Sequence, residues 1–201
     1  NGKVVTVKDG TDTIALIDLG QPPPKLIAEL KVPASIVGPP QSVAVSPKEE
    51  IALVTAAEML DPADPTRRVP ADTLTVVELN TKAPGIVSKM TARIRGKSAE
   101  QAPPKVLAIL KAGKGAAGVA INRTGTLALV ANRAEDTISV FAIKGKEVTA
   151  VGEKLKIGDG KRPANPAGIV FTADGKRALV TRDGDSRISI LNIDGQSVTL
   201  D

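Results

Sequence analysis

Carboxylates, lysines, arginines and hydroxyls are the only side chains from which this sequence could build a catalytic site. Its 201 residues include no histidine, cysteine, tryptophan or tyrosine. Disulfides, thiol nucleophiles, Ser-His-Asp triads, imidazole bases and the usual zinc sites are therefore excluded within the chain. Any catalysis here has to use carboxylates, cations or hydroxyls.

Two acidic loops resemble fragments of calcium-binding loops, because carboxylates two or three residues apart can converge on a hard cation. They are Asp9-Gly10-Thr11-Asp12 and Asp183-Gly184-Asp185. Asp-Gly is also the preferred chemistry of tight turns, and the twelve-residue loop with its terminal glutamate is absent. We therefore interpret both segments as turns and expect neither a metal site nor a cofactor.

Other charged segments are candidates for acid-base chemistry or anion binding. Glu58, Asp61 and Asp64 lie in EMLDPADPTRRVPA, whose three prolines favour a stiffened, exposed loop over a strand. The segment 158–168, GDGKRPANPAG, is rich in glycine and basic, so it could offer amides and cations to phosphate or carboxylate. No P-loop motif and no helix follow it.

The composition fits a folded chain with a mild preference for acidic partners. Hydrophobic residues make up 42%, enough for a sizeable core, and 27 basic against 22 acidic residues give a net charge of +5. Only Phe141 and Phe171 are aromatic, so platforms for stacking nucleic acid bases are missing and we expect no nucleic acid partner. No apolar run reaches eighteen residues, and we expect no membrane span.

The elements that would position these side chains show up as an internal repeat. Residues 118–143 read GVAINRTGTLALVANRAEDTISVFAI, and residues 168–193 read GIVFTADGKRALVTRDGDSRISILNI, aligned without a gap at a spacing of 50. A third copy begins at Ser42 as SVAVSPKEEIALVTA, is interrupted, and resumes at Asp72. A partial copy, VVTVKDGTDTIALIDL, covers residues 4–19. A fixed period of this length is the signature of a repeat architecture.

Each unit alternates apolar and polar residues in short runs rich in Val, Ile, Leu and Thr, separated by turn residues, which predicts four strands per unit. The expected inner strands are 43–46, 119–122 and 169–172. The second strands are 51–56, 127–131 and 177–181, and the third are 73–79, 137–143 and 187–193. The outer strands are 25–32, 105–112 and 148–157. The nearest candidate for a helix is 86–97.

The four-stranded period predicts an all-β fold of β-propeller blades. The segment LVAN at Leu129–Asn132, between GVAINRTGTLA and DTISVFAI, resembles the YVTN-type repeat of the lactonase-like seven-bladed propellers. SVAVSP at 42–47 and FTADGKRALVT at 171–181 are close to the same pattern, although the tyrosine of the name motif is absent.

We expect a single partial propeller of about three and a half blades, half of a seven-bladed ring. The predicted blades are 1–40 (lacking its inner strand), 41–115 (with insertions 57–71 and 80–103), 116–165 and 166–201. Three and a half blades cannot close a ring. We expect the ring to be completed by missing sequence, including residues before Asn1, by another chain or by another copy.

In propellers, loops between second and third strands lie on the same rim as connections from outer to inner strands. That rim is expected to gather a set of cations around the channel mouth as a ligand-binding site for an anion: Arg67, Arg68, Lys114, Arg133, Lys161, Arg162 and Arg182. A solvated basic face explains the same pattern and stays open as the alternative. The insertion 81–104, with Lys82, Lys89, Arg93, Arg95 and Lys97, is a candidate contact for a partner chain.

Two functions remain open at this stage. The favoured one is a non-enzymatic binding or scaffold protein that engages an anionic small molecule or a protein partner through its basic rim and insertions. The alternative, implied by the resemblance alone, is a lactonase-like enzyme acting on a sugar lactone or a carboxymuconate-type substrate. The resemblance also implies a periplasmic or extracellular location.

Overall fold

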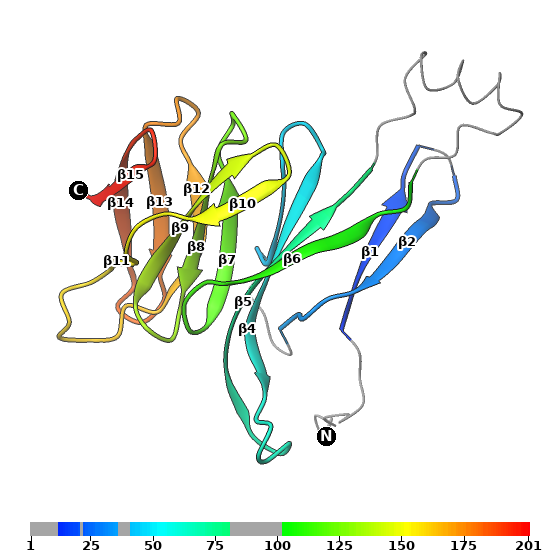
Figure 1. The fold of residues 1–201 in the computed structure, drawn as a ribbon. Coiled ribbons are helices and arrows are strands. Elements are labelled where there is room, and N and C mark those ends of the chain that lie inside the picture. The colour runs from blue at the N-terminus through cyan, green and yellow to red at the C-terminus, as the bar shows by residue number, and fades with distance from the viewer. Residues whose placement is uncertain (1–11, 21, 36–40, 81–101) are drawn as a thin grey trace, which may run out of the picture.

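The computed structural model describes residues 12–20, 22–35, 41–80 and 102–201, and in these residues it contains strands and no helix. The strands form four antiparallel sheets that follow one another along the chain (Figure 1). The all-β architecture of repeated antiparallel sheets predicted from the sequence is confirmed.

We number the sheets I to IV in chain order; within a sheet, strands that follow one another in the chain pair with each other, except that β11 pairs with β9. Sheet I contains β1 (Thr13–Asp18) and β2 (Lys25–Lys31). Sheet II contains β3 (Val43–Val45), β4 (Ile51–Leu60), β5 (Arg68–Glu78) and β6 (Lys105–Lys111). Sheet III contains β7 (Ala116–Ile121), β8 (Leu127–Asn132), β9 (Thr137–Lys144), β10 (Glu147–Ala150) and β11 (Leu155–Lys156). Sheet IV contains β12 (Pro166–Phe171), β13 (Arg177–Arg182), β14 (Arg187–Asp194) and β15 (Ser197–Leu200).

The sheets stand face to face in a row, with β7 in contact with both β3 and β12 (Figure 1). The first strands of sheets II, III and IV therefore lie next to one another, as the inner strands of propeller blades do. Each sheet has a forward face, toward the sheet that follows in the chain, and a back face, toward the sheet that precedes it.

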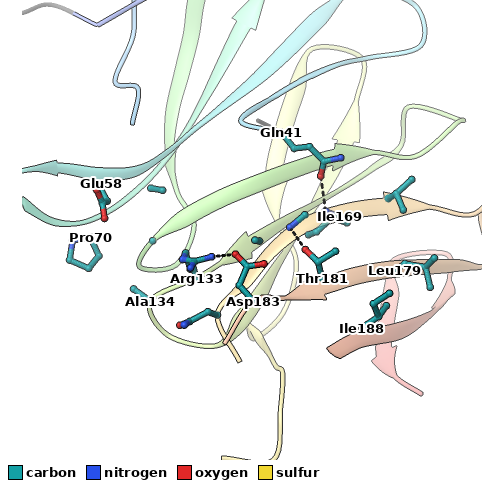
Figure 2. Close-up of a pocket in the computed structure, with 16 residues that line it drawn as sticks. Gln41, Glu58, Pro70, Arg133, Ala134, Ile169, Leu179, Thr181, Asp183 and Ile188 are labelled. Carbon is teal, nitrogen blue, oxygen red and sulfur yellow. Dashed lines mark hydrogen bonds and ion pairs between the residues drawn. The ribbon is translucent and has the colours of Figure 1, made fainter. Parts of the chain in front are cut away.

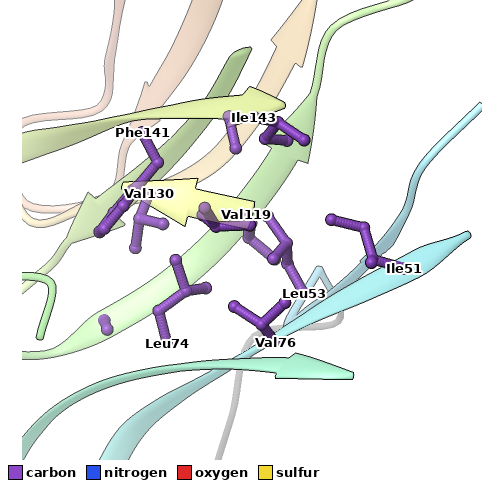
Figure 3. Close-up of a cluster of buried hydrophobic side chains, with 11 residues drawn as sticks. Ile51, Leu53, Leu74, Val76, Val119, Val130, Phe141 and Ile143 are labelled. Atoms are coloured by element: carbon purple, nitrogen blue, oxygen red, sulfur yellow. The ribbon is translucent and has the colours of Figure 1, made fainter. Parts of the chain in front are cut away.

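Apolar alternation along the strands fills the space between successive sheets. The forward face of sheet II, with Leu53 and Leu74, packs on the back face of sheet III, with Val130 and Phe141 (Figure 3). The forward face of sheet III, with Leu129 and Ile138, packs in the same way on the back face of sheet IV. A smaller cluster joins sheets I and II. Because side chains on a strand alternate between faces, the period-two pattern alone decides which residues enter which interface.

The close approach of sheets III and IV depends on a glycine. A Cβ built on Gly118 in β7 would stand 2.0 Å from the carbonyl oxygen of Ala167 in β12. No side chain fits there without moving one of the two backbones. Gly118 therefore has a packing role, in addition to marking the start of the repeat.

Two predicted elements differ in the structure. The segment 57–71, expected as a loop because of its prolines, instead extends β4 and β5 into a long two-stranded ribbon, in which Glu58 pairs with Pro70. A proline is tolerated there because a two-stranded ribbon has two open edges where no partner requires its N–H. The single outer strand expected at 148–157 is divided into β10 and β11, with Gly152 at φ 62 between them. The candidate helix 86–97 and the first part of the partial repeat copy, residues 4–11, lie outside the described residues.

Candidate functional site: a cavity at the loop rim

A cavity of about 940 Å³ opens between the ribbon of sheet II, the β8–β9 loop of sheet III and the inner part of sheet IV. Its lining falls into a polar end and an apolar wall. The polar end includes Glu58, Arg133, Asn165 and Asp183. Val170, Leu179 and Ile188 form the apolar wall on sheet IV (Figure 2).

An ion pair holds the polar end together. The Arg133 guanidinium, in the loop after β8, donates through Nη1 to Oδ2 of Asp183, in the loop after β13 (Figure 2). Both side chains are partly exposed, at 42% and 50%. A guanidinium carries five N–H donors in a planar fork, so the bond to Asp183 fixes its orientation and leaves donors for a carboxylate or a carbonyl oxygen.

The sheet II ribbon brings a second carboxylate to this end of the cavity. Glu58 follows the bulge at Ala56/Glu58 in β4, and its backbone N–H donates to Ser35 Oγ at 3.2 Å. Arg68 Nη1, on the opposite strand of the ribbon, lies 3.9 Å from Glu58 Oε2. Such a long contact between half-exposed groups is weak, so the Glu58 carboxylate can exchange Arg68 for a ligand or water.

Side chains and backbone fix the floor of the cavity. Gln41 Oε1 accepts the N–H of Ile169 at 3.0 Å, and Thr181 Oγ1 accepts the N–H of Gly168 at 2.8 Å (Figure 2). The N–H of Gly168 lies within the bulge between Pro166 and Ile169, where the ladder to β13 is interrupted, and Thr181 supplies its acceptor. The start of β12 is thereby held in place beneath Arg133 and Asp183.

The β8–β9 loop, which presents Arg133, is anchored by Glu135. Burial alone would raise the pKa of Glu135, but hydrogen bonds from Lys154, Thr137 and the Lys114 backbone outweigh it and lower the pKa. Lys154 Nζ lies 2.6 Å from Glu135 Oε1. Glu135 is therefore an anchoring carboxylate, ionised at neutral pH.

The β13–β14 loop, which gives Asp183 to the large cavity, also contributes Asp185 to a smaller cavity of about 360 Å³. Its five lining residues are all charged: Asp159, Lys161, Arg162, Asp185 and Arg187. The backbone N–H of Lys161 and the nearby arginines Arg187 and Arg182 lower the pKa of Asp159. Three cations face two carboxylates in this cavity, so it is only weakly basic.

The described residues contain no group of three or more acidic side chains that could hold a metal ion. The described part of the chain also has no helix that could cross a lipid bilayer. The candidate site therefore consists of Arg133, Asp183 and Glu58, together with the groups that hold these three side chains in place.

Comparison with known proteins places this architecture in a family. The sequence profile of the family described as "Lactonase, 7-bladed beta-propeller" matches residues 73–201. The chain belongs to this family. No curated protein matches the sequence significantly.

Solved structures of low sequence identity share the lactonase propeller fold. A periplasmic gluconolactonase from Pseudomonas aeruginosa superposes with a TM-score of 0.62 at 15% identity, covering 94% of this chain and 49% of that one. A protein from Bacteroides uniformis with a proposed 6-phosphogluconolactonase activity gives 0.60 at 14% identity, covering 94% and 50%. The chain thus spans about half the length of these propellers, and at such identities the likeness concerns the fold.

Among the cations expected from the sequence, Arg133 alone lines the large cavity of this lactonase-family chain. Lys161 and Arg162 line the smaller cavity, and Arg68 approaches Glu58. Arg67 is exposed near the tip of the ribbon, where its backbone N–H donates to Asp64. The Lys114 carbonyl accepts the N–H of Ala134, next to Arg133.

Arg182 lies inside sheet IV. Its side chain is 9% exposed and binds Oδ2 of Asp185 and, at 3.3 Å, Oγ of Ser189. The equivalent residue of sheet III, Asn132, makes the corresponding bond to Ser139 at 2.9 Å. Arg182 therefore takes the structural role that an asparagine has one repeat earlier.

Sequence reasoning missed Asp183, Glu58 and Gln41 as partners in one cavity. Asp183 was interpreted as a turn residue and Glu58 as part of an exposed loop. A signal for the first was available, because Arg133 and Asp183 hold the same position in successive 50-residue units and carry opposite charges. Gln41 lies just before the repeat unit, so a comparison of the repeats gives no signal for it.

Proposed function

We propose that this protein hydrolyses a sugar lactone at the polar end of the large cavity. Family membership supports a lactonase more than the non-enzymatic scaffold that the sequence alone favoured. The observation that carries the proposal is the placement of an oriented guanidinium, Arg133, and a weakly engaged carboxylate, Glu58, in one cavity. The carboxymuconate-type lactones are the second substrate class, and the same groups suit them.

The chemistry needs an activated water and a stabilised oxyanion. Glu58 accepts a proton from a water as that water attacks the lactone carbonyl carbon, and Arg133 donates to the carbonyl oxygen as it gains negative charge. The bond from this carbon to the ring oxygen then breaks, and the ring oxygen leaves as a hydroxyl after taking the proton. One lactone and one water give one hydroxy acid, with no redox step.

Asp183 acts in this scheme as a positioning residue. It holds the Arg133 guanidinium in one orientation, so the remaining donors need not be ordered when the lactone binds. Removing the Asp183 carboxylate is expected to raise KM more than it lowers kcat. Without it the Arg133 guanidinium is free to rotate, and the main effect is weaker binding of the lactone.

The test is hydrolysis of glucono-δ-lactone and its 6-phospho form by the full chain, followed with a pH indicator after subtraction of spontaneous ring opening. Glu58→Gln and Arg133→Met are each expected to lower kcat/KM at least about 100-fold, the usual range for a lost base or oxyanion donor. Arg123→Met, an exposed arginine in the turn between β7 and β8, is the matched control. No turnover above the buffer rate, or unchanged rates in both variants, would overturn the proposal.

The location and the blade type are further parts of this proposal. We place the protein in the periplasm or outside the cell, with support from the periplasmic gluconolactonase that shares its fold. Release of the protein by osmotic shock of its host is expected, whereas retention with cytoplasmic markers would contradict this location.

We also propose that its blades are of the YVTN type, on the strength of LVAN at Leu129–Asn132.

A further inference from the structure

The smaller cavity lies where sheet IV departs from a hydrogen-bond network of sheet III. In sheet III, Asn132 Oδ1 accepts the N–H of Gly113 at 2.9 Å, which holds the connection from β6 to β7 against the blade. The Asn132 amide also donates to Thr137 and Ser139, each at 2.9 Å. These groups are tightly packed, because a Cβ on Gly113 would stand 2.1 Å from Glu135 Oε1.

Two arginines replace this network fifty residues later. Arg182 holds the position of Asn132, and Arg187 holds that of Thr137. Arg182 pairs with Asp185 inside its own blade, whereas Arg187 is exposed and lines the cavity. The position that is neutral and hydrogen-bonded in sheet III therefore carries an exposed cation in sheet IV.

The connection from β11 to β12 supplies two further cations. It spans residues 157–165, whereas the connection from β6 to β7 spans only 112–115. Lys161 and Arg162 lie in this longer segment and line the cavity together with Arg187. Within the described part of the chain, none of these three side chains forms an ion pair or a hydrogen bond.

The charge balance around the cavity is positive. The lining residues alone carry one excess positive charge, and Arg182, which pairs with Asp185 without lining the cavity, adds a second. The backbone N–H of Lys161 and the charges of Arg187 and Arg182 lower the pKa of Asp159, so this carboxyl is ionised at neutral pH and is already included in the balance. Cations that converge without partners repel one another, and a bound anion relieves that repulsion.

The buried pair next to the cavity has polar atoms without partners. Arg182 Nε and Asp185 Oδ1 are both buried and form no hydrogen bond with a described residue. In native proteins such atoms are usually satisfied by an ordered water or a bound ion. Hydrogen phosphate carries an O–H donor and oxygen acceptors, which are the two kinds of partner that these atoms lack.

We propose that the smaller cavity binds a phosphoryl group, either as inorganic phosphate or as a phosphate monoester. A phosphate dianion matches the excess of two positive charges around the cavity. Its tetrahedral oxygens point in several directions, which suits cations supplied by two separate segments, and an arginine fork can hold two of these oxygens at once. The two cavities share no lining residue, so this is a second site and stands independently of lactone hydrolysis.

The first test is calorimetric titration of the full chain with inorganic phosphate at about pH 7.5, in sodium chloride of constant ionic strength. We expect a single class of site. Arg187→Met and Lys161→Met should each weaken phosphate binding at least about 10-fold, which is typical of one lost charge-assisted hydrogen bond. Both residues are exposed, so both variants should keep the circular dichroism of the wild type.

The matched control for these variants is Arg123→Met, which removes the same charge from an exposed turn and should leave phosphate affinity nearly unchanged. No phosphate binding above that of chloride overturns the inference. An equal loss of affinity in Arg123→Met, Arg187→Met and Lys161→Met also overturns it, because phosphate would then respond only to net charge.

The second test separates this site from the large cavity. Arg133→Met removes the cation of the large cavity and should keep its phosphate affinity. Phosphate binding that is lost in Arg133→Met and kept in Arg187→Met would assign the anion to the large cavity and overturn the inference. Because the readout is phosphate binding, a chain without lactonase activity can still confirm this site.

The third test identifies the chemistry and the source of the ligand by titration with glycerol phosphate and succinate. Glycerol phosphate that binds more tightly than inorganic phosphate points to a monoester, and weaker binding points to the free ion. Both results support a phosphoryl site. Succinate that binds as tightly as phosphate would show a site for any dianion and would overturn the assignment.

Discussion

Arg133 and Asp183 hold the same position in successive repeats, and their side chains form an ion pair that bridges the loops of sheets III and IV. Because both groups are partly exposed, the pair should contribute only about 0.2–1 kcal/mol to stability. We expect Arg133→Asp to lower the free energy of unfolding slightly and the double exchange Arg133→Asp/Asp183→Arg to restore it, as measured by urea denaturation. If lactone hydrolysis is retained in Arg133→Asp, which leaves no guanidinium in this pair, the role proposed for Arg133 is wrong.

Removing Arg182 is expected to be far more costly than removing Arg133. The Asp185 side chain is as buried as that of Arg182, and Arg182→Met would leave the Asp185 carboxylate unpaired inside the blade. A loss of about 3–5 kcal/mol is typical of such a broken buried pair. Adding Asp185→Asn to Arg182→Met should recover part of the lost stability. The control Arg123→Met should have little effect on stability. Equal urea midpoints for Arg182→Met and Arg123→Met would contradict this account.

Gly118 and Gly168 hold equivalent positions in successive repeats, but substitution by alanine should destabilise the protein by different amounts at the two positions. Gly118→Ala brings a Cβ within 2.0 Å of a backbone oxygen, whereas at Gly168 the nearest atoms are Gln41 Oε1 at 3.0 Å and Thr181 Oγ1 at 3.2 Å. Side-chain ends can move, but the strand backbone of β12 cannot do so without disturbing its sheet. Gly118→Ala is expected to cost about 1–3 kcal/mol and Gly168→Ala less, by thermal or urea unfolding.

The stability of the contact between sheets II and III should depend on pH through Glu78. The hydrogen bond from Lys146 lowers the pKa of this carboxyl, and burial opposes the effect only in part. A lowered pKa in the folded state adds stability above the ordinary value of 4.5, which is lost as the pH falls through the folded-state pKa. Wild type should therefore be more stable than Glu78→Gln at pH 7, and the difference should shrink below pH 4.5. A difference that stays constant between pH 7 and pH 3 would argue against this.

Leu129 and Leu179 provide a comparison of the same side chain in a covered and an open interface. Leu129→Ala should cost about 2–5 kcal/mol at any protein concentration, because the residue is fully buried within one chain. The cost of Leu179→Ala should be smaller, because this side chain is 37% exposed in the described structure. Thermal or urea unfolding measures both effects.

The repeat made most of the fold predictable. Val, Ile and Leu alternate within each 50-residue unit, and alternation assigns residues to the two faces of a strand without any knowledge of what those faces meet. The antiparallel order of β12 to β15 follows from the short turns between them. The ribbon at 57–71 was missed because prolines exclude the interior of a sheet but not a two-stranded extension with open edges.

The amino-acid sequence by itself determined the period, the strands and the chemistry that is absent, because these depend on residue types and on neighbours along the chain. Tertiary structure decided which charges meet: Arg182 is enclosed by its own blade, whereas Arg133 reaches across to Asp183 and shares a cavity with Glu58. The two arginines occupy adjacent positions of the repeat: Arg182 stands where Asn132 stands one unit earlier, and Arg133 stands one residue further on. The partner that Arg133 meets depends on the stacking of sheets and on the side chain fifty residues away, and local sequence carries neither.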